Sequence, residues 1–161
     1  MKKILKTLID YSLFEKYDKD YFINNKILPL FENDISIKMA VCKNSKLETI
    51  KNDFNKVISF LEIDELELLF MISHIDQKTL LYSMALKAIS QNSFEKYVDK
   101  FLQELLSFSI NLRASDIHIE QYKDVILFKF RIDGRLKTFF AFYSEFFKLI
   151  SSYIKLISTL D

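Results

Sequence analysis

Hydrophobic and polar positions divide the chain into segments of helical and of strand periodicity. Where apolar residues recur every three to four positions, an amphipathic helix is predicted. The stripe that starts at Phe94 is the most continuous, and Ser93 before it is a suitable N-cap. Ser45 is the predicted N-cap of another helix, whereas the run LELLFMIS is too short for periodicity to distinguish helix from strand. The predicted helices cover residues 1–24, 46–57, 76–90, 94–112 and 144–161.

Segments in which apolar residues alternate with polar residues predict strands between these helices. An Asn33-Asp34 turn separates two of them, and Pro29 lies in the first. The predicted strands are KILPLF, ISIKMAVC, ISFLEI, SDIHIE, DVILFKFRID and the segment that returns after it. The pattern breaks at Gln91-Asn92-Ser93, so we predict two small α+β domains, 1–91 and 92–161. The second is expected to hold an antiparallel sheet with a hairpin, packed against flanking helices.

The dipeptide Asp133-Gly134 is a strong signal for the turn of that hairpin. A two-residue turn would set the apolar Phe130 opposite Lys137, which is unfavourable on a core face. We therefore predict a three-residue loop formed by Asp133-Gly134-Arg135. Its register sets Leu136 opposite Ile132 and Phe140 opposite Phe128.

Composition excludes several classes of protein. Half of the 161 residues are hydrophobic and the formal net charge is +1, which argues against a disordered chain and against a general nucleic-acid binder. Only one glycine is present, so neither a P-loop nor a dinucleotide-binding fingerprint can be formed. No apolar run is long enough to span a membrane, which predicts a soluble protein. The single cysteine, Cys42, is expected to be a small core residue in a reducing cytoplasm.

Three polar residues share one face of the predicted strand SDIHIE. Asp116, His118 and Glu120 alternate with apolar residues, so their side chains point to the same side. A row of carboxylate, imidazole and carboxylate could bind a metal ion. The alternative is a solvated strand face whose charges pair with basic neighbours.

Basic residues gather on the neighbouring hairpin. The chain contains 20 lysines but only three arginines, and two of these, Arg131 and Arg135, lie here. The planar fork of arginine suits phosphate or carboxylate groups better than the point charge of lysine. The alternative is that Arg131 pairs with Asp133 or Glu120 on the surface. We expect Arg135 at the turn, and the face away from the core to carry Lys129, Arg131 and Lys137.

Two short motifs resemble a known family. The residues A-S-D-I-H-I-E at 114–120 and F-R-I-D-G-x-L at 130–136 are similar to a motif pair of the ATPases of type II secretion and type IV pilus assembly. The resemblance implies that 92–161 is the domain before the motor domain, and that 1–91 is a first domain that docks on an inner-membrane platform protein. The chain would then be the N-terminal fragment of a hexameric cytoplasmic ATPase that powers protein secretion, pilus assembly or DNA uptake, peripheral at the inner membrane through its partner.

The same resemblance implies roles for individual residues. Arg131, Arg135 and Lys129 would contact the phosphates of ATP held with Mg by the motor domain. Interdomain polar contacts are implied for the motif residues Asp116, His118, Glu120, Asp133 and Gly134. No catalytic residue, cofactor, metal or direct nucleic-acid contact is expected in the fragment itself. Two rival hypotheses are a stand-alone interaction adaptor without a motor, and a metal-dependent enzyme that uses the row on strand SDIHIE.

Overall fold

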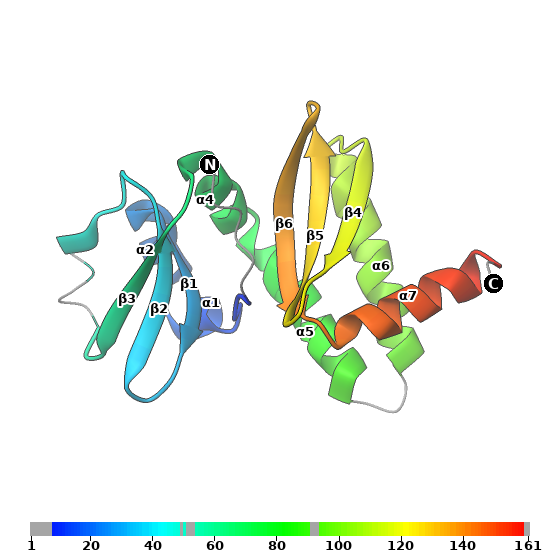
Figure 1. Cartoon of the computed structure of the whole chain (residues 1–161), viewed down its shortest axis with the longest axis horizontal. Helices are drawn as coiled ribbons and strands as arrows, with labels where there is room; N and C mark the ends of the chain where they lie inside the picture. The colour runs from blue at the N-terminus through cyan, green and yellow to red at the C-terminus, as the bar shows by residue number, and fades with distance from the viewer. Residues whose placement is uncertain (1–7, 49, 51–53, 91–93, 160–161) are drawn as a thin grey trace. The chain divides into compact units, whose positions relative to one another are not determined.

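The protein has the predicted α+β fold, with two three-stranded sheets and their helices (Figure 1). The computed structural model describes residues 8–48, 50, 54–90 and 94–159. The chain divides into two compact units, Met1–Asp76 and Gln77–Asp161. The predicted domain boundary between residues 91 and 92, like the predicted cap at Ser93, lies outside the described residues and stays a prediction.

The first unit is built on a mixed sheet of β1 (Ile27–Glu32), β2 (Ser36–Val41) and β3 (Val57–Glu62). The strand order is β1-β2-β3, with β1 antiparallel and β3 parallel to β2. The side-chain oxygen of Asn33 accepts hydrogen bonds from the amides of Ile35 and Ser36 and closes the turn between β1 and β2. All three predicted strands of this unit are therefore confirmed.

The helices of the first unit are shorter than the sequence predicted. The single helix over 1–24 is wrong within the described residues, because two short helices stand there, α1 (Leu13–Lys16) and α2 (Lys19–Asn25). Asp18 separates them, since it adopts an extended conformation and caps α2 with its carboxylate. The ambiguous run LELLFMIS belongs to a helix, α4 (Glu65–Ile72).

The helix predicted over 46–57 falls partly on residues 49 and 51–53, outside the described part. Residues 47, 48 and 50 are helical, but Val57 already begins β3, so the predicted end is wrong. Ser45 is not its N-cap either: the Ser45 hydroxyl accepts from the amide of Cys42 at 2.9 Å and donates to the carbonyl of Lys26. Cys42 is buried, as predicted.

The second unit contains an antiparallel sheet of order β4-β5-β6 and the predicted helices. Phe101, in the helix over Phe94–Asn111, packs on Phe128 and Phe140 of the sheet and on Phe146 of the helix over Phe146–Ile157. The ring centroids are 4.9–5.8 Å apart. Among the described residues, no helix is long and apolar enough to cross a membrane. The elements are α5 (Ile75–Ser90), whose first two residues belong to the first unit, α6 (Phe94–Asn111), β4 (Asp116–Gln121), β5 (Val125–Ile132), β6 (Arg135–Tyr143) and α7 (Phe146–Ile157).

The hairpin between β5 and β6 does not have the predicted three-residue loop. Ile132 pairs with Arg135, so the loop has two residues, Asp133 and Gly134, with φ angles of 49° and 73°. Positive φ at both positions is the requirement of a type I′ turn, which aspartate and glycine can adopt. The predicted pair of Ile132 with Leu136 is therefore wrong.

A β-bulge at Phe139 explains why the other predicted pair, Phe128 with Phe140, is nevertheless correct. The register shifts between Phe128 and Lys129, so β6 contains one extra residue there. Phe139 stacks on Phe130 at 4.4 Å and on Phe108 of α6 at 5.0 Å, and it is fully buried. The two-residue turn shifts the pairing of β5 and β6 by one residue relative to the apolar pattern. The bulge at Phe139 restores the pairing of core residues beyond it.

The same register corrects the predicted position of Lys137. It lies opposite Phe130, on the other face from Lys129 and Arg131. The polar face of β5 therefore carries two of the three predicted basic residues.

Candidate functional site

The polar face of the second sheet is formed by alternate residues of β4 and β5. The antiparallel register sets Asp116 opposite Arg131 and His118 opposite Lys129. Side chains directly opposite each other on one face have Cβ atoms about 5 Å apart, close enough to pair. The structure thus brings together five of the predicted site residues, because Glu120 lies two positions beyond His118 on the same face.

Arg131 is held by Asp116. Its Nε donates to both carboxylate oxygens, at 3.0 Å to Oδ2 and 3.3 Å to Oδ1. The hydroxyl of Ser115 also donates to Oδ2, at 2.7 Å. This hydrogen bond, with those from His118 and Arg131, lowers the pKa of Asp116 although partial burial opposes the shift. The side chains of Arg131 and Asp116 are 38% and 40% exposed, so solvent screens the pair.

His118 lies between the two members of this ion pair. Its Nε2 contacts Asp116 Oδ1 and, at 3.2 Å, Arg131 Nη2. A carboxylate only accepts hydrogen bonds and a guanidinium only donates them, so one ring nitrogen satisfies one neighbour at a time. With a proton on Nε2 the ring donates to Asp116, and with a lone pair there it accepts from Arg131.

Lys129 belongs to a second, more buried pair. Its Nζ contacts Glu120 Oε2 at 2.6 Å, and only 7% of the Lys129 side chain is exposed. The hydroxyl of Tyr122 donates to the same oxygen at 2.7 Å. The hydrogen bonds from Lys129 and Tyr122 lower the pKa of Glu120, and the bond to Glu120 raises the pKa of Tyr122. Lys129 is thus committed to a partner inside its own unit.

The side chains of Asp116, His118 and Glu120 do not converge on one point, as a metal-binding row would require. Asp116 and His118 turn toward Arg131, whereas Glu120 turns toward Lys129. In the ranges that the structure describes, no three His, Cys, Asp or Glu side chains are grouped so that they could hold a metal ion. The row acts in the structure as a set of acceptors for the two cations of β5.

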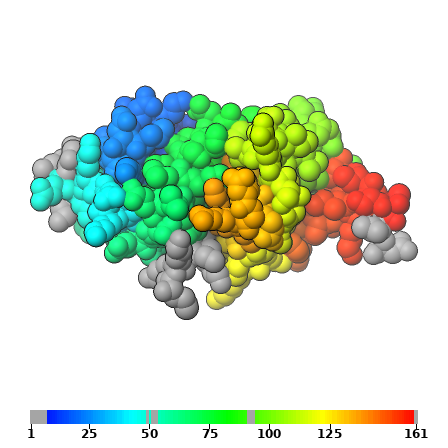
Figure 2. Space-filling view, turned by 90° about the horizontal axis from the view of Figure 1, so that it is seen from above, coloured from blue at the N-terminus to red at the C-terminus, as the bar shows by residue number. Residues whose placement is uncertain are grey.

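The hairpin tip is separate from this face. Asp133, Gly134 and Arg135 are exposed at the end of the hairpin, which points toward the viewer in the space-filling view (Figure 2). Arg131 pairs with Leu136, so strand alternation puts the next residue, Arg135, on the opposite face from Arg131. The structure does not bring the two arginines together on one face.

Sequence reasoning missed some members of this network. Ser115 and Tyr122 were not predicted, and the partner weighed for Arg131 was Asp133 or Glu120 instead of Asp116. The signal was present in part: two alternating strands joined by the short segment QYKD predict an antiparallel hairpin. The register of that hairpin alone decides which acid lies opposite the arginine.

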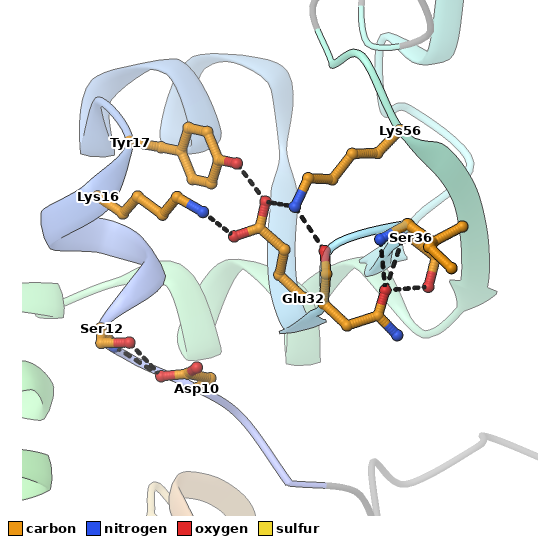
Figure 3. Close-up of polar contacts among 9 residues, drawn as sticks. Asp10, Ser12, Lys16, Tyr17, Glu32, Ser36 and Lys56 are labelled. Atoms are coloured by element: carbon orange, nitrogen blue, oxygen red, sulfur yellow. Dashed lines mark hydrogen bonds and ion pairs between the residues drawn. The ribbon is translucent and has the colours of Figure 1, made fainter.

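A second cluster of charged residues, in the first unit, was not predicted at all (Figure 3). Glu32, at the end of β1, accepts hydrogen bonds from Lys16, Tyr17 and Lys56. Burial opposes ionisation of this carboxyl, but the three donors together lower its pKa to about 2. Lys56 also donates to the carbonyl of Asn33, so the cluster ties β1, α1 and the start of β3 together.

The part of the chain that is similar to known proteins lies in the second unit. Residues 90–161 match the family described as Type II/IV secretion system protein. Type II secretion system protein E of Aeromonas hydrophila is 37% identical over 62 residues, which are 38% of this chain and 12% of the relative. A putative type II secretion system protein E of Escherichia coli K12 is 39% identical over 64 residues, 40% of this chain and 13% of the relative. The corresponding protein of Pectobacterium carotovorum is 36% identical over 62 residues.

These matches confirm the resemblance to type II secretion proteins for the segment that contains both motifs and the whole polar face. The matched segment spans only about an eighth of the length of these relatives.

Proposed function

We propose that this chain is the N-terminal part of a secretion ATPase and that Arg131 delivers positive charge to the phosphates of ATP held by a motor domain. The observation that carries the proposal is the placement of Arg131 on a half-exposed polar face inside the matched segment. The relatives named type II secretion system protein E support the secretion part of it.

The contacts of Arg131 suit such a role. Asp116 accepts from Nε, and His118 accepts from Nη2 when its Nε2 carries a lone pair, so the guanidinium is oriented before any ligand arrives. No group of the described residues accepts a hydrogen bond from Nη1. Arginine can donate to two phosphate oxygens at once, and an oriented fork loses less conformational freedom on binding than a mobile one.

The remaining cations of the site have secondary places in this proposal. The ammonium of Lys129 is already paired with Glu120, so Lys129 would have to leave this pair to contact a phosphate. Arg135 would reach a phosphate only from the exposed tip of the hairpin. Asp116 and His118 act as positioning residues for Arg131.

The wider assignment rests on the resemblance. The protein would work in the cytoplasm as a hexamer, with ATP and Mg bound by the motor domain. The first domain would dock on an inner-membrane platform protein, and the machine would drive type II secretion, pilus assembly or DNA uptake.

The test is substitution of Arg131 in a form of the protein that carries the motor domain. Arg131→Ala is expected to lower the ATPase rate on the order of 10³-fold, as for other charge-stabilising arginines in phosphoryl transfer. Arg113→Ala is the matched control, because it removes an exposed arginine of the same unit that makes no ion pair among the described residues. Equal rates for the two variants, with both folded, would reject the role of Arg131.

A further inference from the structure

The two edges of the first sheet are built differently. At the β1 edge, Pro29 has no amide hydrogen to offer another strand, and the register shifts between Pro29 and Phe31. Proline and bulges are the usual means by which proteins prevent pairing at an edge. The opposite edge, β3, follows β2 in a regular parallel register over all six residues and contains no proline or lysine. Only one edge is protected.

β3 directs a row of backbone groups away from its neighbour β2. The amide of Val57 donates to the carbonyl of Ile35, just before β2, and the amide of Ile63 donates to the carbonyl of Val41 in β2. In a parallel ladder alternate residues make these bonds, so the residues between them point their N–H and C=O groups outward. In β3 these are Ile58, Phe60 and Glu62. In the described part of the chain, no strand lies beyond them.

The side chains of this strand are also accessible. Val57 is 66% exposed, Ser59 and Glu62 are exposed, and Ile58, Phe60 and Leu61 are half-buried. An edge of this kind, with apolar side chains and outward backbone groups, is a template for another strand.

The order of residues indicates which strand fits. Residues 56–62 read Lys-Val-Ile-Ser-Phe-Leu-Glu, which is symmetric about Ser59: one serine in the centre, two apolar residues on each side, and opposite charges at the ends. Such a segment is complementary to an antiparallel copy of itself. A two-fold axis generates this self-complementary contact.

We propose that β3 forms an antiparallel pair with β3 of a second copy of this chain, about a two-fold axis at Ser59. Ile58 then lies opposite Phe60 of the partner, and both residues have outward backbone groups, as a hydrogen-bonded pair requires. Of the two neighbouring registers that keep these hydrogen bonds, one sets Ile58 opposite Glu62 and the other sets Phe60 opposite Lys56, and both are unfavourable. Lys56 lies opposite Glu62, but it also holds Glu32. The central pairs therefore carry most of the attraction.

Disulfide trapping tests both the pair and its register. In a non-hydrogen-bonded antiparallel pair the Cα atoms are about 4.5 Å apart, within disulfide range. Ser59→Cys is therefore expected to form a cross-linked dimer under mild oxidation. Val57→Cys, on the same strand, is the matched control, since its partner copy would lie about 13 Å away. A mixture of Val57→Cys and Leu61→Cys chains should form the mixed dimer.

The outcomes separate the proposal from its rivals. Cross-linking of Ser59→Cys no faster than that of Val57→Cys would overturn the register. Absence of any cross-link would overturn the pair, and so would protection of this edge by an extended segment of a different protein while the chain stays monomeric. The native Cys42 is buried and should not interfere.

Sedimentation of the 19.2 kDa chain without added cysteines provides the second test. The mean mass should rise with concentration toward twice that of one chain, as for a small interface. Val57→Lys is expected to raise the dissociation constant about tenfold, since each substitution enters a symmetric interface twice. Ile35→Lys adds the same charge at a more exposed position before β2 and should leave the association unchanged. Equal effects of both, or no association, would overturn the proposal.

Discussion

Each of the two clusters of charged residues in this protein is built around a carboxylate, but the two carboxylates differ in how far they are buried. In the first unit, the Glu32 carboxylate is 5% exposed and receives donors from three parts of the chain. In the second unit, Asp116 and Arg131 are 40% and 38% exposed, and both come from neighbouring strands of one hairpin.

Burial decides what each cluster can do. Around Glu32 the donors converge on one buried acceptor, and the ionised form is stabilised so strongly that the pKa falls to about 2. Around Asp116 the pKa is also lowered, first by the Ser115 hydroxyl, but solvent reaches both partners. A buried network fixes a fold, whereas a screened pair can exchange its partner for a ligand. We therefore assign a structural role to the first cluster and keep contact with phosphate as a proposal for the second.

The largest expected effect on stability is that of Glu32→Gln. The shift of its pKa from 4.5 to about 2 corresponds to about 3 kcal/mol of stability at pH 7. Unfolding in urea at pH 7 should show a loss of this order. Glu15→Gln, at an exposed position of α1, is the control and should have little effect. Equal loss in both variants would contradict the assignment of Glu32.

The pH dependence of stability should reveal the same group. The folded pKa of Glu32 is depressed, so its contribution is present above pH 4.5 and is lost as the pH falls through about 2. Other acids titrate in this range too, so the quantity to measure is the difference in unfolding free energy between wild type and Glu32→Gln. This difference should be constant from pH 7 to 5 and shrink toward zero near pH 2. A difference that does not change with pH would contradict the prediction.

The two lysines of the Glu32 cluster should contribute unequally. Lys56 is 21% exposed and also holds the carbonyl of Asn33, whereas Lys16 is 54% exposed. Lys56→Met is expected to destabilise the protein by about 1–2 kcal/mol, because hydrogen bonds of a charged group are lost in a largely buried place. Lys16→Met should have a clearly smaller effect on the urea midpoint. A larger loss of stability in Lys16→Met than in Lys56→Met would show that the exposure of each lysine does not determine its contribution.

The two clusters also differ in how far the sequence predicts them. Asp116, His118, Lys129 and Arg131 lie on alternating strands joined by a short turn, so strand periodicity alone places them on one face. The donors to Glu32 come from residues 16, 17 and 56, and no local pattern connects positions so far apart in the chain. Local periodicity predicts which residues share one face of a strand, whereas tertiary packing decides which residues form hydrogen bonds with each other.

The hairpin shows the same limit within one element. The dipeptide Asp133-Gly134 correctly predicts a turn, and the apolar pattern correctly sets Phe128 opposite Phe140. A two-residue turn and the pairing of Phe128 with Phe140 differ in register by one residue. The sequence-based prediction accommodated the difference with a three-residue loop. The protein resolves it with a bulge at Phe139, because that residue can stack on Phe130 and Phe108. No rule of turn chemistry predicts this position.

The smallest expected effect on stability, and the sharpest test of the exposed cluster, is Asp116→Asn. It removes the charge that holds Arg131 Nε while keeping the shape of the side chain. The urea midpoint should stay close to that of wild type, but the Nε–H of Arg131 should exchange faster with water in ¹⁵N NMR spectra, since its acceptor is weaker. Asp124→Asn removes an equal charge from the exposed turn between β4 and β5 and should leave this signal unchanged. An Arg131 signal that does not respond to Asp116→Asn would mean that the pair does not orient the guanidinium, and the contrast between the two clusters would then rest on Glu32 alone.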